Sequence, residues 1–161
     1  MEKVDRKEKD RQDLPFISVI IPAYNPGSLL HECLAPLRDS DYPRFEVIVV
    51  DDASPSPIEI AGAPDNRFKV ICLEENSGPA GARNAGVKQA AGTIILFIDT
   101  DVLIRPGCLE RIGRFFLQPG KEKWGLTGIQ TEKMGYGNFS SEYKNLWLRY
   151  SFVESPSESG L

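Results

Sequence analysis

The sequence lacks several features that would place it in common classes of protein. Its 161 residues include one histidine and three cysteines, and its net charge is −4, which excludes the basic balance typical of nucleic-acid-binding proteins. Its most apolar stretch, residues 93–98, is far shorter than the about 18 residues of a membrane-spanning helix, and no signal peptide precedes the first predicted strand. We therefore expect no nucleic-acid partner, no membrane span, and a location in the cytoplasm or peripherally at the inner face of the membrane.

The cysteines and the histidine do not form a pattern of reactive or metal-binding residues. Cys33, Cys72 and Cys108 are odd in number and far apart, and two of them lie in apolar helix or strand patterns, so we interpret them as buried free thiols. His31 lies on a predicted helix without a patterned Cys, Ser or second His. We expect it to have a surface or helix-packing role.

No glycine-rich phosphate-binding motif follows the first predicted strand. The turn at residues 22–27 reads PAYNPG, without the Gly-x-Gly-x-x-Gly spacing that lets a pyrophosphate reach a helix N-terminus. A P-loop is absent from the sequence too. These absences disfavour a nicotinamide-dependent enzyme.

What the chain does have is a regular alternation of strand and helix patterns. We expect residues 1–14 to be a charged, disordered arm and residues 15–161 to form one domain. The alternation predicts an α/β fold of three layers, with a mostly parallel central sheet between helices. Strands are predicted at residues 16–21, 45–50, 68–73, 93–98 and 124–130, and helices at residues 28–38, 80–91, 106–117 and 141–153.

Three details of these elements follow from their residues. The continuous apolar run at residues 93–98 predicts a central strand that is buried on both faces. Pro22 is expected to stop the first strand, and Pro36 to kink the first helix or end it early.

Polar residues follow three of the predicted strands at their carboxyl ends, the edge at which parallel sheets bind ligands. Two acids close together repel each other, so the pair at residues 99–101 suits a divalent cation or a set of hydroxyl donors. A solvated turn is the alternative. The residues expected to converge are Pro22, Ala23, Tyr24 and Asn25 after the first strand, Asp51 and Asp52 after the second, and Asp99, Thr100 and Asp101 after the fourth.

Four blocks in this order resemble family 2 glycosyltransferases of the GT-A fold. The blocks are SVIIPAYN at residues 18–25, VVDDAS at residues 49–54, NSGPAGARNAG at residues 76–86 and FIDTD at residues 97–101. The resemblance implies transfer of a sugar from a nucleotide-diphosphate donor, usually with inversion and with Mn²⁺ or Mg²⁺ on the diphosphate. It also implies a role in building cell-envelope polysaccharide.

The resemblance gives roles to residues that would bind the nucleotide. It places Pro22, Ala23 and Tyr24 against the base, with the Tyr24 ring available for stacking, and Asp52 beside Asp51 at the base edge. A carboxylate can accept the imide N–H of uracil, which favours UDP over other nucleotides. The alternative for both acids is a turn or helix-capping pair.

The resemblance also assigns the diphosphate side of the donor. Arg83 would lie near the base or the diphosphate, where its guanidinium suits an anion, although a surface salt bridge is the alternative. Asp99 would contact the ribose hydroxyls, with Thr100 beside it in the donor site. Asp101 would ligate the metal.

The sequence departs from the family pattern in three places, near the base, after the second strand and at the general base. Pro26 stands where relatives often carry Glu, and Pro55-Ser56-Pro57 replaces a usual helix start. An inverting enzyme needs a general base, which we expect beyond Leu161, with the acceptor side of the domain truncated. The chain alone would then be inactive or would dock to a missing C-terminal region or a second copy, and the acceptor, whether saccharide, lipid or protein, stays unassigned. The later acids, none in a family context, are Glu132, Glu142, Glu154 and Glu158.

Two other functions compete with donor transfer. The segment from Phe97 to Leu103 also resembles the first motif of haloacid-dehalogenase-type phosphatases, in which Asp99 would be the nucleophile and Asp101 the general acid. Three predicted strands precede that segment, whereas such a motif usually opens its domain. A nucleotide-sugar-binding module without turnover is the second alternative.

Overall fold

The computed structural model describes residues 13–60, 65–121, 125, 126 and 128. All of the helices and strands described below belong to the first of two compact units, Met1–Glu122. The strands are β1 (Ile17–Ala23), β2 (Phe45–Asp51), β3 (Phe68–Cys72) and β4 (Ile94–Phe97), and the helices are α2 (Leu29–Arg38), α3 (Gly78–Lys88) and α4 (Cys108–Phe116).

The four strands form one parallel sheet in the order β3-β2-β1-β4. Ile17 pairs with Phe45 on one side and with Ile94 on the other, so β1, β2 and β4 begin at the same level. The order reverses beside β1, because the chain runs outward from β1 to β3 and then crosses to the opposite side of β1 for β4. Ligands of open α/β sheets bind at such a reversal, outside the carboxyl ends of the strands.

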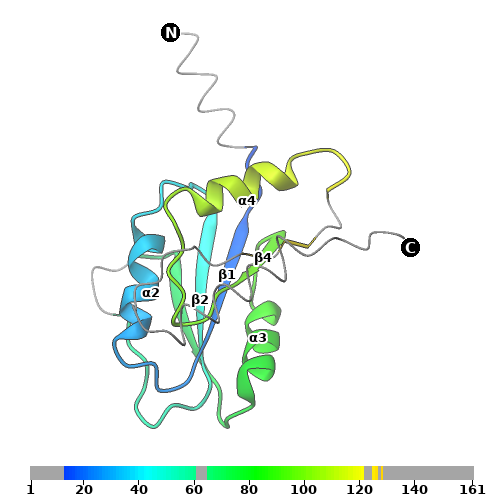
Figure 1. The fold of residues 1–161 in the computed structure, drawn as a ribbon. Coiled ribbons are helices and arrows are strands. Elements are labelled where there is room, and N and C mark those ends of the chain that lie inside the picture. The colour runs from blue at the N-terminus through cyan, green and yellow to red at the C-terminus, as the bar shows by residue number, and fades with distance from the viewer. Residues whose placement is uncertain (1–12, 61–64, 122–124, 127, 129–161) are drawn as a thin grey trace, which may run out of the picture. The chain divides into compact units, whose positions relative to one another are not determined.

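Two apolar layers cover the sheet, as the alternation of strand side chains requires. On one face Val19, Val47 and neighbouring strand residues contact the buried side of α2 and Leu109 of α4. On the other face Ile20, Ile48 and Val50 contact Ala82 of α3, and Figure 1 shows α2 and α3 on opposite sides of the sheet. The prediction of a three-layer α/β fold with a parallel sheet is confirmed.

Glycine at position 86 sets how closely α3 lies against the sheet. A Cβ atom on Gly86 would lie 2.5 Å from Cγ2 of Ile20 and 3.1 Å from Cγ2 of Val50. The helix backbone therefore lies directly on the β1 and β2 side chains. At the other end of α3, the Ser77 N–H donates to Asp52, which follows β2, and this bond holds the start of the helix beside the carboxyl end of the strand.

The prediction of a central, fully buried strand at residues 93–98 is wrong for the part of the chain that the structure describes. There β4 pairs with β1 alone and its residues are half-buried, with Phe97 47% exposed. An apolar run indicates that a strand packs against other elements but does not give the number of strands that pair with it.

The prediction that Pro22 stops the first strand is wrong, and so is an early end of the first helix at Pro36. β1 continues through Pro22 to Ala23, and α2 continues through Pro36 to Arg38. Ile20 accepts a hydrogen bond from Ile98 on the β4 side of β1, and Pro22, two residues later, faces the same side, where the pairing with β4 has ended at Ile20. The missing N–H of Pro22 therefore costs no ladder hydrogen bond.

The cysteines differ more in burial than expected. All three are free, with Cys33 buried, Cys108 intermediate and Cys72 exposed, so the interpretation of Cys72 as a buried thiol is wrong. His31 is exposed, which agrees with a surface role.

Several predicted elements lie outside the described residues. These are the arm up to residue 12, the helix at residues 141–153, and most of the strand at residues 124–130, of which Gly125, Leu126 and Gly128 are described and do not lie in a strand. Within the described residues, no helix is long and apolar enough to cross a membrane.

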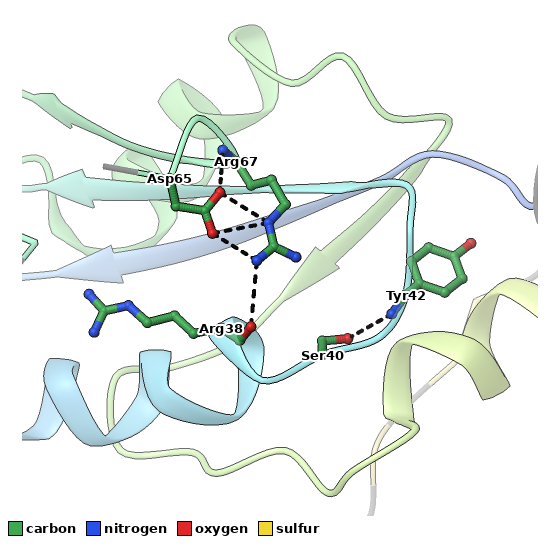
Figure 2. Close-up of polar contacts among 5 residues, drawn as sticks. All are labelled: Arg38, Ser40, Tyr42, Asp65 and Arg67. Atoms are coloured by element: carbon green, nitrogen blue, oxygen red, sulfur yellow. Dashed lines mark hydrogen bonds and ion pairs between the residues drawn. The ribbon is translucent and has the colours of Figure 1, made fainter. Parts of the chain in front are cut away.

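Polar side chains close the amino edge of the sheet, opposite the carboxyl ends of the strands. Arg67 binds Asp65 at 2.7 Å, lies over the Phe45 ring at 4.6 Å, and donates to the backbone carbonyl of Arg38 at the end of α2, as Figure 2 shows for Asp65 and Arg38. On the other side of Figure 2, the Tyr42 N–H donates to Ser40 Oγ. The hydroxyl of Tyr42 donates to the carbonyl of Pro15 at 2.6 Å.

Glu46 is the centre of a second polar cluster at this edge. Its Oε1 accepts hydrogen bonds from Ser18 Oγ at 2.6 Å and the Ala91 N–H at 2.7 Å, and its Oε2 lies 2.9 Å from Lys69 Nζ. Burial acts to raise the pKa of Glu46, but these hydrogen bonds and the Lys69 charge together hold it below its usual value. The cluster fixes the turn between α3 and β4 against the sheet.

Candidate functional site

The ends of β1 and β2 are joined at the carboxyl edge by two hydrogen bonds between their loops. The Asp52 N–H donates to the Ala23 carbonyl at 2.8 Å, and the Asn25 N–H donates to Ser54 Oγ at 2.9 Å. Tyr24 lies between these two anchored positions and is 56% exposed. The structure therefore brings the predicted base-contacting residues of the first two strand ends together.

The Asp51 side chain forms hydrogen bonds with the loop that follows β2. It is the last residue of β2 and is buried. Its Oδ1 accepts the Ser54 N–H at 2.9 Å and its Oδ2 accepts the Ile58 N–H at 3.3 Å. These bonds match the turn-pair alternative for this acid, with both oxygens binding backbone groups.

Asp52 is buried in a different environment, with a relative exposure of 3%. Its Oδ1 accepts the N–H of Ser77, the residue that caps α3, at 2.7 Å, and its backbone carbonyl accepts from the Asn76 side chain at 3.2 Å. Among the described residues, no hydrogen bond is donated to Oδ2. The carboxylate is therefore held from one side and keeps one acceptor oxygen for another donor.

Arg83 of α3 and Asp99 after β4 form an ion pair across the carboxyl edge. Arg83 Nη2 lies 2.6 Å from Asp99 Oδ1, and the two side chains are 33% and 58% exposed. The surface salt bridge was the alternative considered for Arg83, and the structure contains it. The ion pair also orients the Asp99 carboxylate, and it is therefore compatible with a role for Asp99 in binding a donor.

The segment that carries Asp101 folds back on itself beside α2. The Val102 N–H donates to the Asp99 carbonyl at 3.0 Å, and the Cys33 thiol contacts the same carbonyl at 3.7 Å. Burial, and after it the negative charges of Asp101 and Asp99, raise the pKa of Cys33 to about 11. Both carboxylates therefore lie near this buried, neutral thiol, with Asp101 exposed and Thr100 half-buried between them.

The donor set suits a metal that arrives with a phosphate ligand. Within the described residues, no group of three His, Cys, Asp or Glu side chains could hold a metal by itself. Mg²⁺ is commonly bound by one or two carboxylates together with substrate phosphates. An exposed Asp101 with Asp99 close by fits that mode.

Sequence reasoning did not identify two residues that support the site. Ser54 links the loops after β1 and β2, and Cys33 supports the Asp99 carbonyl from α2. Ser54 stands in the quoted block at residues 49–54, but the block does not indicate which backbone group its hydroxyl binds. The later acids Glu132, Glu142, Glu154 and Glu158 lie outside the described residues.

Asp99 follows the fourth strand along the chain and is ion-paired with Arg83. A phosphatase motif of this kind usually lies on the strand that opens its domain, whereas β4 follows three other strands. The arrangement disfavours the phosphatase interpretation.

Comparisons with known proteins agree with this geometry. The chain is 36% identical over 101 residues to the succinoglycan biosynthesis protein ExoO of Rhizobium meliloti (strain 1021), an alignment that covers 62% of this chain and 29% of that protein. It is 36% identical to S. aureus TarS 1-349 in complex with UDP-GlcNAc, with a TM-score of 0.54 over 63% of this chain and 31% of that one.

A third protein, the mannosyltransferase PcManGT from Pyrobaculum calidifontis in complex with GDP-Man and Mn²⁺, is 29% identical with a TM-score of 0.58, over 68% of this chain and 34% of that one. The chain thus spans about a third of the length of these relatives. Solved structures with this likeness are GT-A glycosyltransferases, and the α/β fold described above is of that type.

The family model described as "Glycosyl transferase family 2" matches residues 18–147, a range that contains the four strands except for Ile17, the first residue of β1, and the candidate residues at their carboxyl ends. The chain therefore belongs to glycosyl transferase family 2.

Proposed function

We propose that this chain carries the donor site of a glycosyltransferase that moves a sugar from a UDP-sugar to an acceptor hydroxyl, with a divalent metal and with inversion. The observation that carries the proposal is Asp52, a buried carboxylate with one oxygen held by Ser77 and no described donor on the other. A buried acceptor without a donor is unfavourable. The imide N–H of a uracil would complete its hydrogen bonding.

Tyr24 supports the same assignment from the neighbouring loop. Its ring is 56% exposed, although large aromatic side chains gain free energy by burial. A base that stacked on this ring with its edge toward Asp52 would cover both groups at once. TarS is seen with UDP-GlcNAc, and PcManGT with GDP-Man. Uracil and guanine both offer a ring N–H to a carboxylate, so the Asp52 contact separates these two bases from cytosine, which has no such donor.

The residues after β4 would bind the rest of the donor. Asp99, which pairs with Arg83, would accept hydrogen bonds from the ribose hydroxyls, with Thr100 beside it, and Asp101 would hold Mn²⁺ or Mg²⁺ against the diphosphate. The metal would supply positive charge that stabilises the departing nucleoside diphosphate. The acceptor hydroxyl also requires a general base, which we expect outside the described residues.

Calorimetric titration with UDP tests the donor site in four conditions: with Mn²⁺, with excess chelator, and with the variants Asp101→Ala and Asp39→Ala in Mn²⁺. Asp39 is an exposed acid at the far end of α2 and serves as the matched control. We expect binding in Mn²⁺ that weakens by about tenfold or more with chelator or in Asp101→Ala, and no change in Asp39→Ala.

Two results would contradict different parts of the proposal. Undiminished metal-dependent binding in Asp101→Ala would remove Asp101 from the metal site while leaving the donor site intact. Failure of the folded wild-type chain to bind UDP in any condition would remove the donor site itself.

A further inference from the structure

The two residues assigned to the base are each followed by a residue with left-handed backbone. Asn25 follows Tyr24 with φ of 44°, and Ala53 follows Asp52 with φ of 58°. Residues with a Cβ rarely adopt this conformation, and they keep it where surrounding contacts over-determine it. The backbone beyond Tyr24 and Asp52 is therefore held in place by specific interactions.

A chain of hydrogen bonds supplies those interactions and begins at the rigid end of β2. The buried Asp51 carboxylate accepts the Ser54 N–H at 2.9 Å and the Ile58 N–H at 3.3 Å, which fixes the loop after β2. Ser54 Oγ then accepts the Asn25 N–H at 2.9 Å. Ser54 thus holds the loop after β1 in a fixed position relative to the end of β2.

The residues on both sides of Tyr24 in the sequence are held by hydrogen bonds to the loop after β2. The residue before it, Ala23, accepts the Asp52 N–H at 2.8 Å, and the residue after it, Asn25, donates to Ser54. Removal of the Ser54 hydroxyl would leave the sheet and the Ala23–Asp52 bond in place but would free the far side of Tyr24. The ring could then move relative to the Asp52 carboxylate.

We propose that Ser54, held by Asp51, is a positioning residue that fixes the Tyr24 ring relative to the Asp52 carboxylate and thereby sets the preference for uracil over cytosine. This inference rests on the proposed function, because it assumes that Tyr24 and Asp52 contact the base. Stacking and a hydrogen bond can act on one planar base together only if the ring and the carboxylate keep a fixed spacing.

The chemistry of the two pyrimidines explains why spacing controls selection. Uracil presents an N3–H donor to a carboxylate, whereas cytosine presents a lone pair at the same position and is repelled. When the Tyr24 ring holds the base in one position, the difference in affinity between uracil and cytosine is largest. When the ring is mobile, the stacked base can shift relative to Asp52. Cytosine then avoids the repulsion between its N3 lone pair and the carboxylate, and the hydrogen bond from uracil N3–H to the carboxylate is weakened.

The experiment measures dissociation constants of UDP and CDP, each with Mn²⁺, by calorimetry on the 161-residue chain and three variants. Ser54→Ala removes the acceptor, Ser54→Thr keeps a hydroxyl at the same position, and Ser56→Ala is a control at an exposed serine in the same loop. Thermal unfolding of each variant establishes that it is folded at the temperature of titration.

We expect Ser54→Ala to lower the ratio of UDP to CDP affinity by about fivefold, Ser54→Thr to restore it, and Ser56→Ala to leave it unchanged. An unaltered ratio in folded Ser54→Ala would overturn the positioning role, as would an equal loss of affinity for both nucleotides, because a purely structural defect weakens both alike. If the wild-type chain bound neither UDP nor CDP, the proposed function would fail, and this inference with it.

Discussion

At the amino edge of the sheet Glu46 pairs with Lys69 and Arg67 pairs with Asp65, whereas at the carboxyl edge several polar groups face solvent. Glu46 accepts hydrogen bonds from Ser18 and Ala91 and forms an ion pair with Lys69. Arg67 binds both carboxylate oxygens of Asp65. At the other edge Tyr24 and Asp101 are exposed. The same kinds of residue thus stabilise the fold at one edge and remain available for a ligand at the other.

The strand ends explain why the two edges differ. At the amino edge, Glu46 fixes the turn that enters β4, and Arg67 links the starts of β2 and β3 to the end of α2. At the carboxyl edge the reversal of strand order lies between β1 and β4, the place where open sheets of this kind bind ligands. A substitution at one edge should therefore affect stability, and a substitution at the other should affect binding.

The largest effect on stability is expected from Glu46→Ala. This change leaves the Ala91 N–H without its acceptor and Lys69 without its ion pair, so the free energy of unfolding should fall by about 2 kcal/mol. Urea denaturation measures this loss, with the exposed Glu75→Ala as the matched control. UDP affinity of the folded variant should stay at the wild-type value, the reverse of Asp101→Ala. Equal losses of stability in Glu46→Ala and Glu75→Ala would show that the cluster does not stabilise the fold.

A smaller effect is expected from acid, with a sign fixed by the pKa of Glu46. Because the folded state holds the pKa of Glu46 below its ordinary value of 4.5, the charged form stabilises the protein fully above pH 4.5, and its contribution is lost as the pH falls through the lowered pKa. Glu46→Gln removes the titration but keeps an acceptor oxygen. Urea denaturation from pH 7 to well below pH 4.5 should therefore show a stability gap between wild type and Glu46→Gln that closes in acid. A gap that stays constant would assign the effect to other groups.

The amino-edge cluster also marks the limit of what the sequence predicts. The strand patterns identified the four strands of the described sheet, and the polar residues after them identified its carboxyl edge, because periodicity and strand ends are local properties. Glu46 contacts Ser18 and Ala91 across distant parts of the sequence, and no local pattern indicates such a contact. The exposure of β4 was missed for the same reason, because the number of strands that pair with it depends on the whole sheet.

The candidate site shows the same division between local and distant information. The motif blocks indicated Tyr24, Asp52, Asp99 and Asp101 as neighbours of a ligand, and the structure brings the loops that hold Tyr24 and Asp52 into direct contact. In the structure Asp51 accepts two backbone N–H groups. The sequence, which has two adjacent Asp residues here, does not indicate which of them binds the backbone. Neighbouring residues of a strand end point in different directions, so identical side chains acquire different roles.

The smallest effect on stability, with a measurable effect on binding, is expected from Arg83→Ala at the carboxyl edge. The Arg83–Asp99 pair is 2.6 Å long, but its side chains are 33% and 58% exposed, and exposed pairs contribute about 0.2–1 kcal/mol at most. The loss of unfolding free energy should therefore be smaller than in Glu46→Ala, while Asp99 loses the group that orients it toward a donor. UDP affinity should fall several-fold, and Arg114→Ala, which breaks an exposed pair with Glu110 on α4, should leave it unchanged. A variant that bound UDP normally but unfolded as readily as Glu46→Ala would place Arg83 among the structural residues, and the contrast between the two edges would not extend to this pair.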